Sequence, residues 1–195
     1  MKIHKIEQCS DEWFAMRKGK MTASHAQAIG SNGAGLKTYI YEILAEEYSS
    51  GENEFYTNKD IERGNELEEP ARLLYEFETD QKVKQVGLIE FNEFVSCSPD
   101  GLIGKDGGIE IKCLNDVNYL KGLLTQKIDS KHLWQIQMNL YITDRKWWDY
   151  VAYNPNFKQN LVIIRVEPEK EMWEKLVAGL ETGTKMLKEL KSKLK

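Results

Sequence analysis

Residues 96–112 constrain the fold more than any other part of the chain. Pro99 disfavours helix at the residue before it, and the turn-forming residues 104–108 favour a reversal of the chain. Residues 109–112 then alternate apolar and charged side chains, as in a β-strand with one buried face. Together these signals predict a hairpin of two strands.

The predicted hairpin brings together side chains that can bind a metal. On the second arm, Glu110 and Lys112 are two residues apart, so their side chains share one face at a spacing of about 7 Å. Asp100 precedes Glu110 by ten residues, so the reversal can place its carboxylate beside them. Two carboxylates suit a hard cation, and the ammonium is a base or an electrostatic clamp. A charged strand face is more often a solvated surface, so this interpretation needs support elsewhere in the chain.

The composition excludes several classes of protein. The 195 residues suit one domain, residues 1–195, and 41% hydrophobic with 30% charged residues is an ordinary globular balance. No apolar run approaches the roughly 18 residues of a membrane span, and residues 1–5 are not followed by the apolar segment of a secretory signal. Three cysteines are too few for a disulfide framework and fit a reducing compartment. We therefore expect a cytoplasmic protein with no membrane partner.

The distribution of charge is more informative than its sum. The net charge of -4, from 27 basic and 31 acidic residues, does not indicate nucleic-acid binding, because general phosphate binders tend to be basic. Basic residues concentrate near both ends of the chain, and acidic residues concentrate between positions 42 and 78. We expect an acidic exterior that hides a local positive groove.

Helices are expected before the hairpin at residues 11–17, with Ser10 as N-cap, and at residues 23–29 and 36–48. Thr57 is a candidate cap for the next helical region. Because Pro70 lacks an N–H, either a helix begins near Glu68 or a longer one is kinked there. We favour a break near Gly64 and a helix over residues 65–77, followed by strands at 82–86, 87–91 and 94–97.

Beyond the hairpin, Asn115 can cap one helix, and Asp129 or Ser130 can cap a second that is apolar nearly all round. Strands are expected at residues 147–153 and 161–166, and Pro168 opens a long terminal helix. This order of elements predicts an α/β (α+β) fold with a mixed central β-sheet flanked by helices.

Five segments, in order along the chain, carry motifs that resemble one family. They are Glu12-Trp13 with Met16-Arg17-x-Gly19 and Thr22-Ala23-Ser24; Gly64-x-x-x-Glu68-x-x-Ala71-Arg72 with Tyr75-Glu76-Phe77; Cys97-Ser98-Pro99-Asp100-Gly101-Leu102; Glu110-Ile111-Lys112-Cys113; and Gln135-x-Gln137. The acidic residue after proline and the Glu-x-Lys pattern resemble the core of the restriction-endonuclease-like nucleases. The whole set resembles lambda-type exonuclease, of the YqaJ viral recombinase family.

The resemblance implies a metal site with the following members. Asp100 and Glu110 would bind Mg²⁺, with two ions per active site and Mn²⁺ as a possible substitute. The carbonyl of Ile111 would complete a site, and Lys112 would orient or help to deprotonate the attacking water. Glu68 would be the helix-borne acid, although Glu66 and Glu69 are equal candidates from the residues alone.

The resemblance also implies groups around this site. Gln135 would lie beside the active centre. Its alternative role is structural, as an amide that hydrogen-bonds to buried backbone groups. Arg17, Ser24 and Ser98 would form a pocket for the 5′-phosphate of a DNA end, and a guanidinium fork with hydroxyl donors suits phosphate oxygens. Each also has a structural alternative: Arg17 as a surface residue, Ser24 as a helix cap and Ser98 as a turn residue.

The function implied by the resemblance is Mg²⁺-dependent 5′-to-3′ exonuclease action on double-stranded DNA ends. It would release mononucleotides and leave 3′ overhangs for phage-type recombination by strand annealing, with a ring-shaped homotrimer and a single-strand annealing protein as partners. The alternatives are a structure-specific or sequence-specific endonuclease on the same fold and a non-catalytic DNA-end-binding protein. Residues 31–37 lack the arginine that family members often use on DNA, so Lys37 or other groups would hold the duplex.

Overall fold

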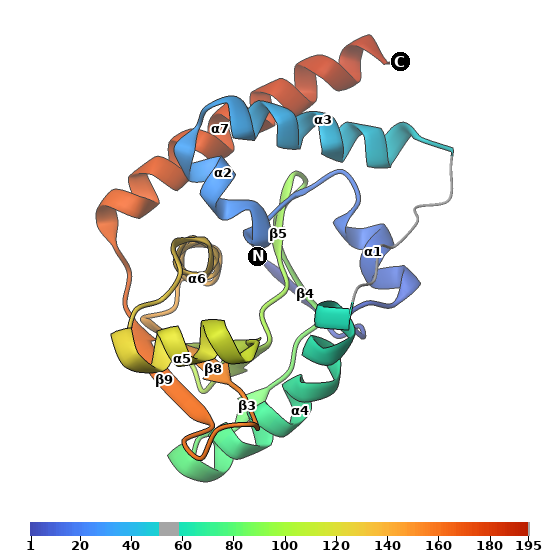
Figure 1. Ribbon diagram of the computed structural model, residues 1–195. Coiled ribbons are helices and arrows are strands. Elements are labelled where there is room, and N and C mark those ends of the chain that lie inside the picture. The colour runs from blue at the N-terminus through green and yellow to red at the C-terminus, as the bar shows by residue number, and fades with distance from the viewer. Residues whose placement is uncertain (51–58, 195) are drawn as a thin grey trace.

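The computed structural model describes residues 1–50 and 59–194, in which helices cover two mixed β-sheets (Figure 1). The larger sheet has the strand order β3-β6-β7-β8-β9. Its strands are β3 (Val83–Lys84), β6 (Gly101–Ile103), β7 (Gly107–Cys113), β8 (Trp147–Tyr153) and β9 (Leu161–Val166). β6 and β7 pair antiparallel, with Gly101 opposite Ile109, which confirms the predicted hairpin. β7 runs parallel to β8, and β8 runs antiparallel to β9.

The smaller sheet has the strand order β1-β4-β5-β2. Its strands are β1 (Lys2–His4), β2 (Met21–Thr22), β4 (Leu88–Asn92) and β5 (Val95–Cys97). The chain leaves this sheet after β5 and enters the larger one at β6, crossing Pro99 between them. Proline cannot donate a ladder hydrogen bond, which explains why the strand pairing is interrupted there. The predicted α/β class and mixed pairing are confirmed, but the strands form two sheets where we expected one central sheet.

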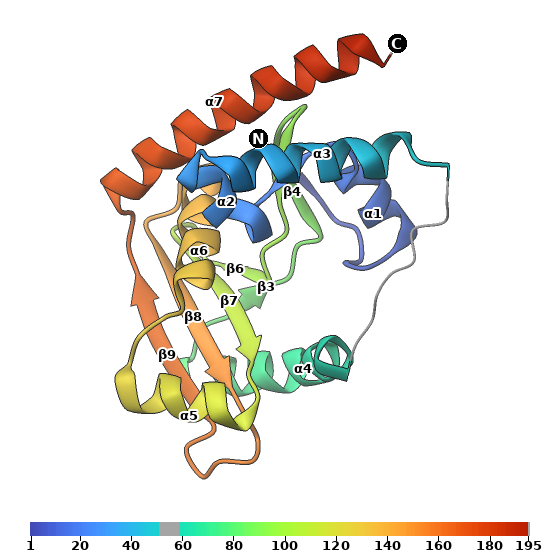
Figure 2. The same cartoon turned by 45° about the horizontal axis from the view of Figure 1, so that its top comes forward.

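The helices lie on both sides of the strands. They are α1 (Asp11–Arg17), the 3-10 turn η1 (Ala23–His25), α2 (Ala26–Ser31), α3 (Ala34–Tyr48), α4 (Lys59–Thr79), α5 (Asp116–Thr125), α6 (Ser130–Thr143) and α7 (Lys170–Lys193). α7 packs on α2, α3 and α6, whereas α4 packs on the opposite face of the larger sheet (Figure 2). Among the residues described, no helix is both long and apolar enough to cross a membrane.

The alternation of β7 divides the protein into two apolar clusters. Ile109 and Ile111 face α4 and pack with the fully buried Ala71 and Tyr75. The larger cluster lies on the other face, among α2, α3, α6, α7 and the smaller sheet. Glu110 points toward that second face, where it meets α6. The predicted alternation therefore holds, but both faces of the strand are covered.

α4 differs from the prediction, because it begins at Lys59 and continues through both Gly64 and Pro70. The expected break near Gly64 is wrong, and the candidate cap Thr57 lies outside the described residues. Tertiary contacts outweigh the local signals: Ala71 is fully buried after the proline, and Arg63 donates to the carbonyl of Leu114 at 3.0 Å. Packing of this kind routinely overrides helix propensity.

Other boundaries differ for physical reasons as well. The helix expected over residues 23–29 is η1 followed by α2, and α2 continues through Gly30 to Ser31 before Asn32 adopts a left-handed φ of 49°. A Cβ on Gly30 would lie 2.2 Å from the ring of Trp134, so this glycine permits close helix packing. The strand predicted over residues 82–86 is shorter, since only β3 forms there. Two short strands, β1 and β2, were not predicted. The terminal helix begins two residues after Pro168.

Two glycines fix the start of the parallel β7–β8 pair. Gly107 lies opposite Trp147, and Gly108 lies opposite Trp148. A Cβ would come within 2.1 Å of the Trp147 ring at the first position and 2.4 Å of the Trp148 ring at the second. Each indole therefore occupies the space that a side chain on its partner would need.

Besides its apolar contacts, α4 is joined to the larger sheet by a network of polar side chains. The Tyr75 hydroxyl donates to Asp149 Oδ2 at 2.7 Å, and Arg165 donates to both Asp149 oxygens at 2.8 and 2.9 Å. Asp149 is 2% exposed, and a carboxylate buried this deeply requires such partners. Tyr75 follows Glu68 by seven residues, about two helical turns, so both side chains lie on the same face of α4.

Replacing Tyr75 by Phe is expected to lower the free energy of unfolding by about 1.5–3 kcal/mol, because a hydrogen bond to a buried charge is lost. Urea denaturation measures the change. Tyr153→Phe is the matched control, since Tyr153 lies in the same cluster and its hydroxyl makes no hydrogen bond to the described part of the chain. Similar losses in both variants would attribute the effect to ring packing.

Candidate active site

The carboxylate of Glu110 lies at the centre of the site. The residue is 1% exposed and is held by three donors. Its Oε1 accepts from Lys112 Nζ and from Gln135 Nε2, each at 2.6 Å, and its Oε2 accepts from Asn139 Nδ2 at 3.2 Å. A buried carboxylate is retained only when its hydrogen-bonding capacity is used in this way. Glu110 is therefore not part of a solvated strand face.

Asp100 reaches the same region from the junction of the two sheets. Its Oδ2 accepts a hydrogen bond of 2.6 Å from the backbone N–H of Ile111. Gln8 supports this corner, because its amide donates to the carbonyls of Pro99 and Val86, both at 3.0 Å. The hairpin thus brings Asp100 beside the Glu110 strand, in the arrangement that the sequence pattern predicts.

Glu68 approaches from α4. Burial raises the pKa of its carboxyl group, the charge of Lys112 opposes that shift, and the charge of Glu110 adds to it. Glu66 and Glu69 are exposed, and Glu69, which lines the same cavity as Glu68, lies 3.6 Å from Arg72 Nη2. Of the three candidate glutamates, Glu68 is therefore the one that faces the hairpin carboxylates.

The charges in the site are unevenly balanced. The pKa of Asp100 lies well above its usual range, because the group is buried and because Glu110 and Glu68 repel its charge. Burial alone would lower the pKa of Lys112, but the charges of Glu110 and Asp100 more than offset this and raise it. The two carboxylates therefore favour the ammonium form of Lys112 in the metal-free site.

The residues present fit a hard divalent cation. In the ranges that the structure describes, no three His, Cys, Asp or Glu side chains converge closely enough to form a metal site by themselves. Asp100 and Glu68 nevertheless offer oxygen ligands, and burial, with a further contribution from the charge of Glu110, raises the pKa of both carboxyl groups. A bound cation would relieve this repulsion, and Mg²⁺ usually takes only one or two carboxylates and fills its other positions with water or phosphate.

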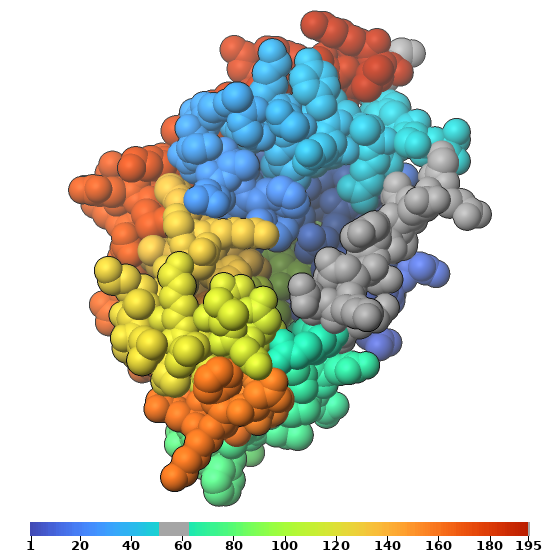
Figure 3. Space-filling model, viewed as in Figure 1, coloured from blue at the N-terminus to red at the C-terminus, as the bar shows by residue number. Residues whose placement is uncertain are grey.

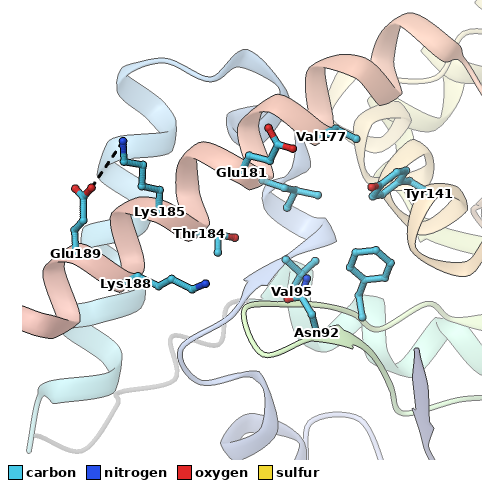
Figure 4. A pocket seen from close by; sticks show the side chains of 11 residues that line it. Asn92, Val95, Tyr141, Val177, Glu181, Thr184, Lys185, Lys188 and Glu189 are labelled. Carbon is cyan, nitrogen blue, oxygen red and sulfur yellow. Dashed lines mark ion pairs between the residues drawn. The ribbon is translucent and has the colours of Figure 1, made fainter.

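A cavity of about 670 Å³ leads to these carboxylates. Glu68 and Asp100 line it together with the segment Lys5 to Cys9 and the segment Lys84 to Gly87. A second cavity, of about 530 Å³, lies between α7 and the β4–β5 hairpin (Figure 4). Its lining includes Val95, Tyr141 and Lys188 but none of the predicted site residues. The cavity relevant to the chemistry is the first.

The predicted phosphate-binding residues are only partly brought together. Arg17 Nη1 donates to Ser98 Oγ at 3.2 Å, and Trp13 Nε1 donates to the same oxygen at 2.9 Å. The Arg17 guanidinium lies 4.0 Å above the centre of the Trp13 ring, beside a pocket of about 280 Å³. Ser24 does not contact Arg17 directly; its Oγ lies 3.1 Å from Thr22 Oγ1 and 3.2 Å from His25 Nδ1.

Sequence reasoning missed Asn139. It follows Gln135 by one helical turn, so both amides project from the same face of α6 onto Glu110. The available signal was this spacing of four between polar residues in an otherwise apolar helix. Gln137, which shares a motif with Gln135, has a structural role: it donates to the carbonyl of Glu167 at 2.8 Å and accepts from Glu169 N–H at 2.9 Å.

Comparison with known proteins places the chain and its fold in a family of nucleic-acid enzymes. The YqaJ-like viral recombinase domain matches residues 12–146, and the chain belongs to that family. The alkaline exonuclease of Laribacter hongkongensis is 31% identical, with 95% of this chain and 98% of that chain covered at a TM-score of 0.82. A structure of that exonuclease in complex with dAMP matches to the same extent.

Two further relatives are more distant. A phage-related exonuclease of Haemophilus somnus 129PT shares the fold, with a TM-score of 0.67, 18% identity, and 90% and 96% of the two chains covered. The uncharacterized protein R354 of Acanthamoeba polyphaga mimivirus is 25% identical over 166 residues, or 77% of this chain. The chain spans about 30% of the length of that curated relative.

Asp100→Asn is expected to stabilise the metal-free protein at pH 8. The folded-state pKa of Asp100 is raised above its unfolded value of about 3.9, so its ionisation disfavours folding once the pH exceeds that value. The gain in stability should therefore grow as pH rises through the folded pKa and vanish below about pH 4. Asn can still accept the hydrogen bond from Ile111.

Thermal unfolding with a chelator measures this effect, and each kcal/mol corresponds to about 2–4 °C for a chain of this size. Asp106→Asn is the control, because Asp106 is an exposed turn residue that pairs with Lys146. A lower melting temperature for Asp100→Asn at pH 8 would contradict the described repulsion.

Proposed function

We propose that the protein is a divalent-metal-dependent nuclease that degrades the 5′-ended strand of linear duplex DNA. It would release mononucleotides and leave 3′ overhangs that an annealing protein can pair. The observation that carries the proposal is Glu110, a carboxylate buried to 1% exposure and held by three donors beside Asp100 and Lys112. The exonuclease from Laribacter hongkongensis supports it, because that enzyme covers nearly the whole chain and binds dAMP, a mononucleotide.

The carboxylates would hold the metal. Asp100, Glu110, Glu68 and the carbonyl of Ile111 supply oxygen ligands of the kind that Mg²⁺ takes, two ions per site being the expectation from the family, and Mn²⁺ would fit the same donors. When bound, such a cation activates water and stabilises the charge that develops on the phosphate. The Gln135 and Asn139 amides fix the plane of the Glu110 carboxylate, so the ligand is oriented before any substrate arrives.

Lys112 would act as a fixed positive charge. Its ammonium lies 2.6 Å from Glu110 Oε1 and its raised pKa keeps it protonated, so it can orient water or a phosphate oxygen. The proton of the attacking water would pass to solvent or to a carboxylate of the site.

Arg17 and Ser98 would bind the terminal 5′-phosphate. The guanidinium lies over the Trp13 ring, 4.0 Å from its centre, and a guanidinium fork can bind two oxygens of one phosphate. Ser24 lies near enough to contribute through the Thr22 and His25 cluster on the same side of the pocket. End recognition by these groups supports exonuclease action over internal cleavage.

The proposal includes a ring-shaped homotrimer around DNA and an annealing partner, both taken from the family resemblance. A closed ring would keep an acidic chain, of net charge -4, attached to its substrate. The mass of the particle in solution, measured by light scattering, tests this part, and a monomer at micromolar concentration with DNA present would remove the ring.

Glu110→Gln is expected to abolish DNA cleavage while preserving the fold, because it removes the central negative charge and keeps the side-chain shape. The assay compares linear and closed circular duplex DNA with Mg²⁺ and with a chelator. The proposal is supported if the wild-type protein degrades the linear duplex but not the circular one, and does so with Mg²⁺ but not with the chelator. Cleavage of the circle would indicate an endonuclease, and cleavage by Glu110→Gln at the wild-type rate would refute the site.

Arg17→Ala is expected to slow digestion of 5′-phosphorylated ends by about tenfold to a hundredfold, which corresponds to the 1.5–3 kcal/mol of a charge-assisted contact. Ends with a 5′-hydroxyl should change much less. Arg17→Lys keeps the charge but loses the fork, so it should restore activity only in part. Equal losses on both kinds of end would give Arg17 a structural or general backbone role.

A further inference from the structure

Helix α5 exposes an apolar stripe that no other part of the described chain covers. Val117, Leu120 and Leu124 recur at spacings of three and four residues, so they lie on one face of the helix. All three are exposed, Leu124 to 75%, whereas Tyr119 on the opposite side is fully buried. In the space-filling view α5, drawn in yellow-green, lies open at the surface (Figure 3). Because surface helices normally direct charged and polar side chains outward, this stripe indicates a binding surface.

The α5 stripe carries one positive charge at its centre. Lys121 follows Val117 by four residues and precedes Leu124 by three, so its side chain projects from the same face. It is exposed and forms no ion pair with the residues that the structure describes. Lys127, also exposed, follows the end of the helix. Aliphatic side chains do not suit the phosphates of DNA, so the surface fits a partner that is apolar and acidic.

Helix α4 exposes a stripe with the complementary character. Leu73 and Phe77 are four residues apart, so they lie on one face, and both are exposed, Phe77 to 86%. Exposed acidic residues flank this pair: Glu66 and Glu69 precede it by seven and four residues, and Asp80 follows the end of the helix. The outer face of α4 is therefore apolar in the middle and acidic around it, as a partner of α5 should be.

The two stripes lie on opposite faces of the larger sheet. α5 contributes Tyr119 to the larger apolar cluster, whereas α4 packs through Ala71 and Tyr75 in the cluster on the other face (Figure 2). A single chain therefore cannot bring its own two stripes together, but a second copy can cover each of them. A contact between two different surfaces of identical chains is heterologous, and its repetition either closes a ring or extends into a filament.

We propose that the stripe of α5 on one copy of the chain packs against the stripe of α4 on the next copy, with Lys121 facing the acidic residues of α4. The inference rests on the ring-shaped homotrimer of the proposed function and names the two surfaces that close it. The contact excludes water from both apolar stripes and pairs a free ammonium with carboxylates. Because α4 also carries Glu68 toward the hairpin, each active site borders a subunit contact.

The test uses two variants of the full chain, each with a charge placed in one stripe. Phe77→Glu blocks the surface of α4, and Leu124→Glu blocks the surface of α5. Light scattering should give the mass of three chains for wild type and of one chain for each variant alone. Mixed in equal amounts, the variants should give the mass of two chains, because together they retain one intact pair of surfaces. The mixture is measured at high concentration, since ring closure no longer reinforces the contact.

Tyr41→Glu is the matched control, because Tyr41 is an exposed aromatic residue on α3, outside both stripes, and receives the same charge. It should keep the mass of wild type. A trimer formed by Phe77→Glu or Leu124→Glu alone would overturn the two surfaces and leave the ring in place, and so would two monomeric variants that do not pair. A monomeric wild-type protein would remove the ring as well, whereas the assay on linear and circular DNA tests the nuclease separately.

The charge of Lys121 gives an independent readout. Lys121→Glu should raise the protein concentration at which the trimer dissociates by about fivefold or more at low salt, because it places like charges across the contact. The difference from wild type should shrink at high salt, where exposed charges are screened. Far-UV circular dichroism and thermal melting establish that each variant is folded. Dissociation of Lys121→Glu at the wild-type concentration in low salt would overturn the pairing of α5 with the acidic face of α4.

Discussion

The burial of the Glu110 carboxylate is the constraint on which the arrangement of the protein depends. A charge with 1% exposure would be unstable without donors, and the donors come from β7 itself and from two successive turns of α6. α6 must therefore lie against β7 at hydrogen-bond distance. The same contacts that satisfy the buried charge also orient it, so the folding requirement and the functional geometry are met by one set of side chains.

The elements that could be predicted from the sequence are those specified by neighbours along the chain. The hairpin is one example, because Pro99, the glycine-rich turn and the alternation around Glu110 all act within residues 96–112. The helix caps at Ser10 and Asn115 are others, and both side chains accept the expected backbone hydrogen bonds. Local chemistry was sufficient in each case.

The elements that could not be predicted depend on distant partners. α4 continues through Gly64 and Pro70 because its buried face packs on the larger sheet, which no local pattern reveals. β1 and β2 span three and two residues and owe their existence to pairing with β4 and β5. Asn139 and His132 lie on a helix whose sequence is mostly apolar. Their polar partners are on β7 and β8, which are distant in the sequence.

The two glycine and tryptophan pairs at the start of β7 and β8 have a consequence for how the sequence can change over time. Gly107 and Trp147, like Gly108 and Trp148, share a single volume, since the indole fills the space of the absent Cβ. A larger residue on β7 is tolerable only with a smaller ring across the ladder. Among homologues these positions should vary as pairs, so an alignment would show covariation forty residues apart, arising from steric exclusion and independent of catalysis.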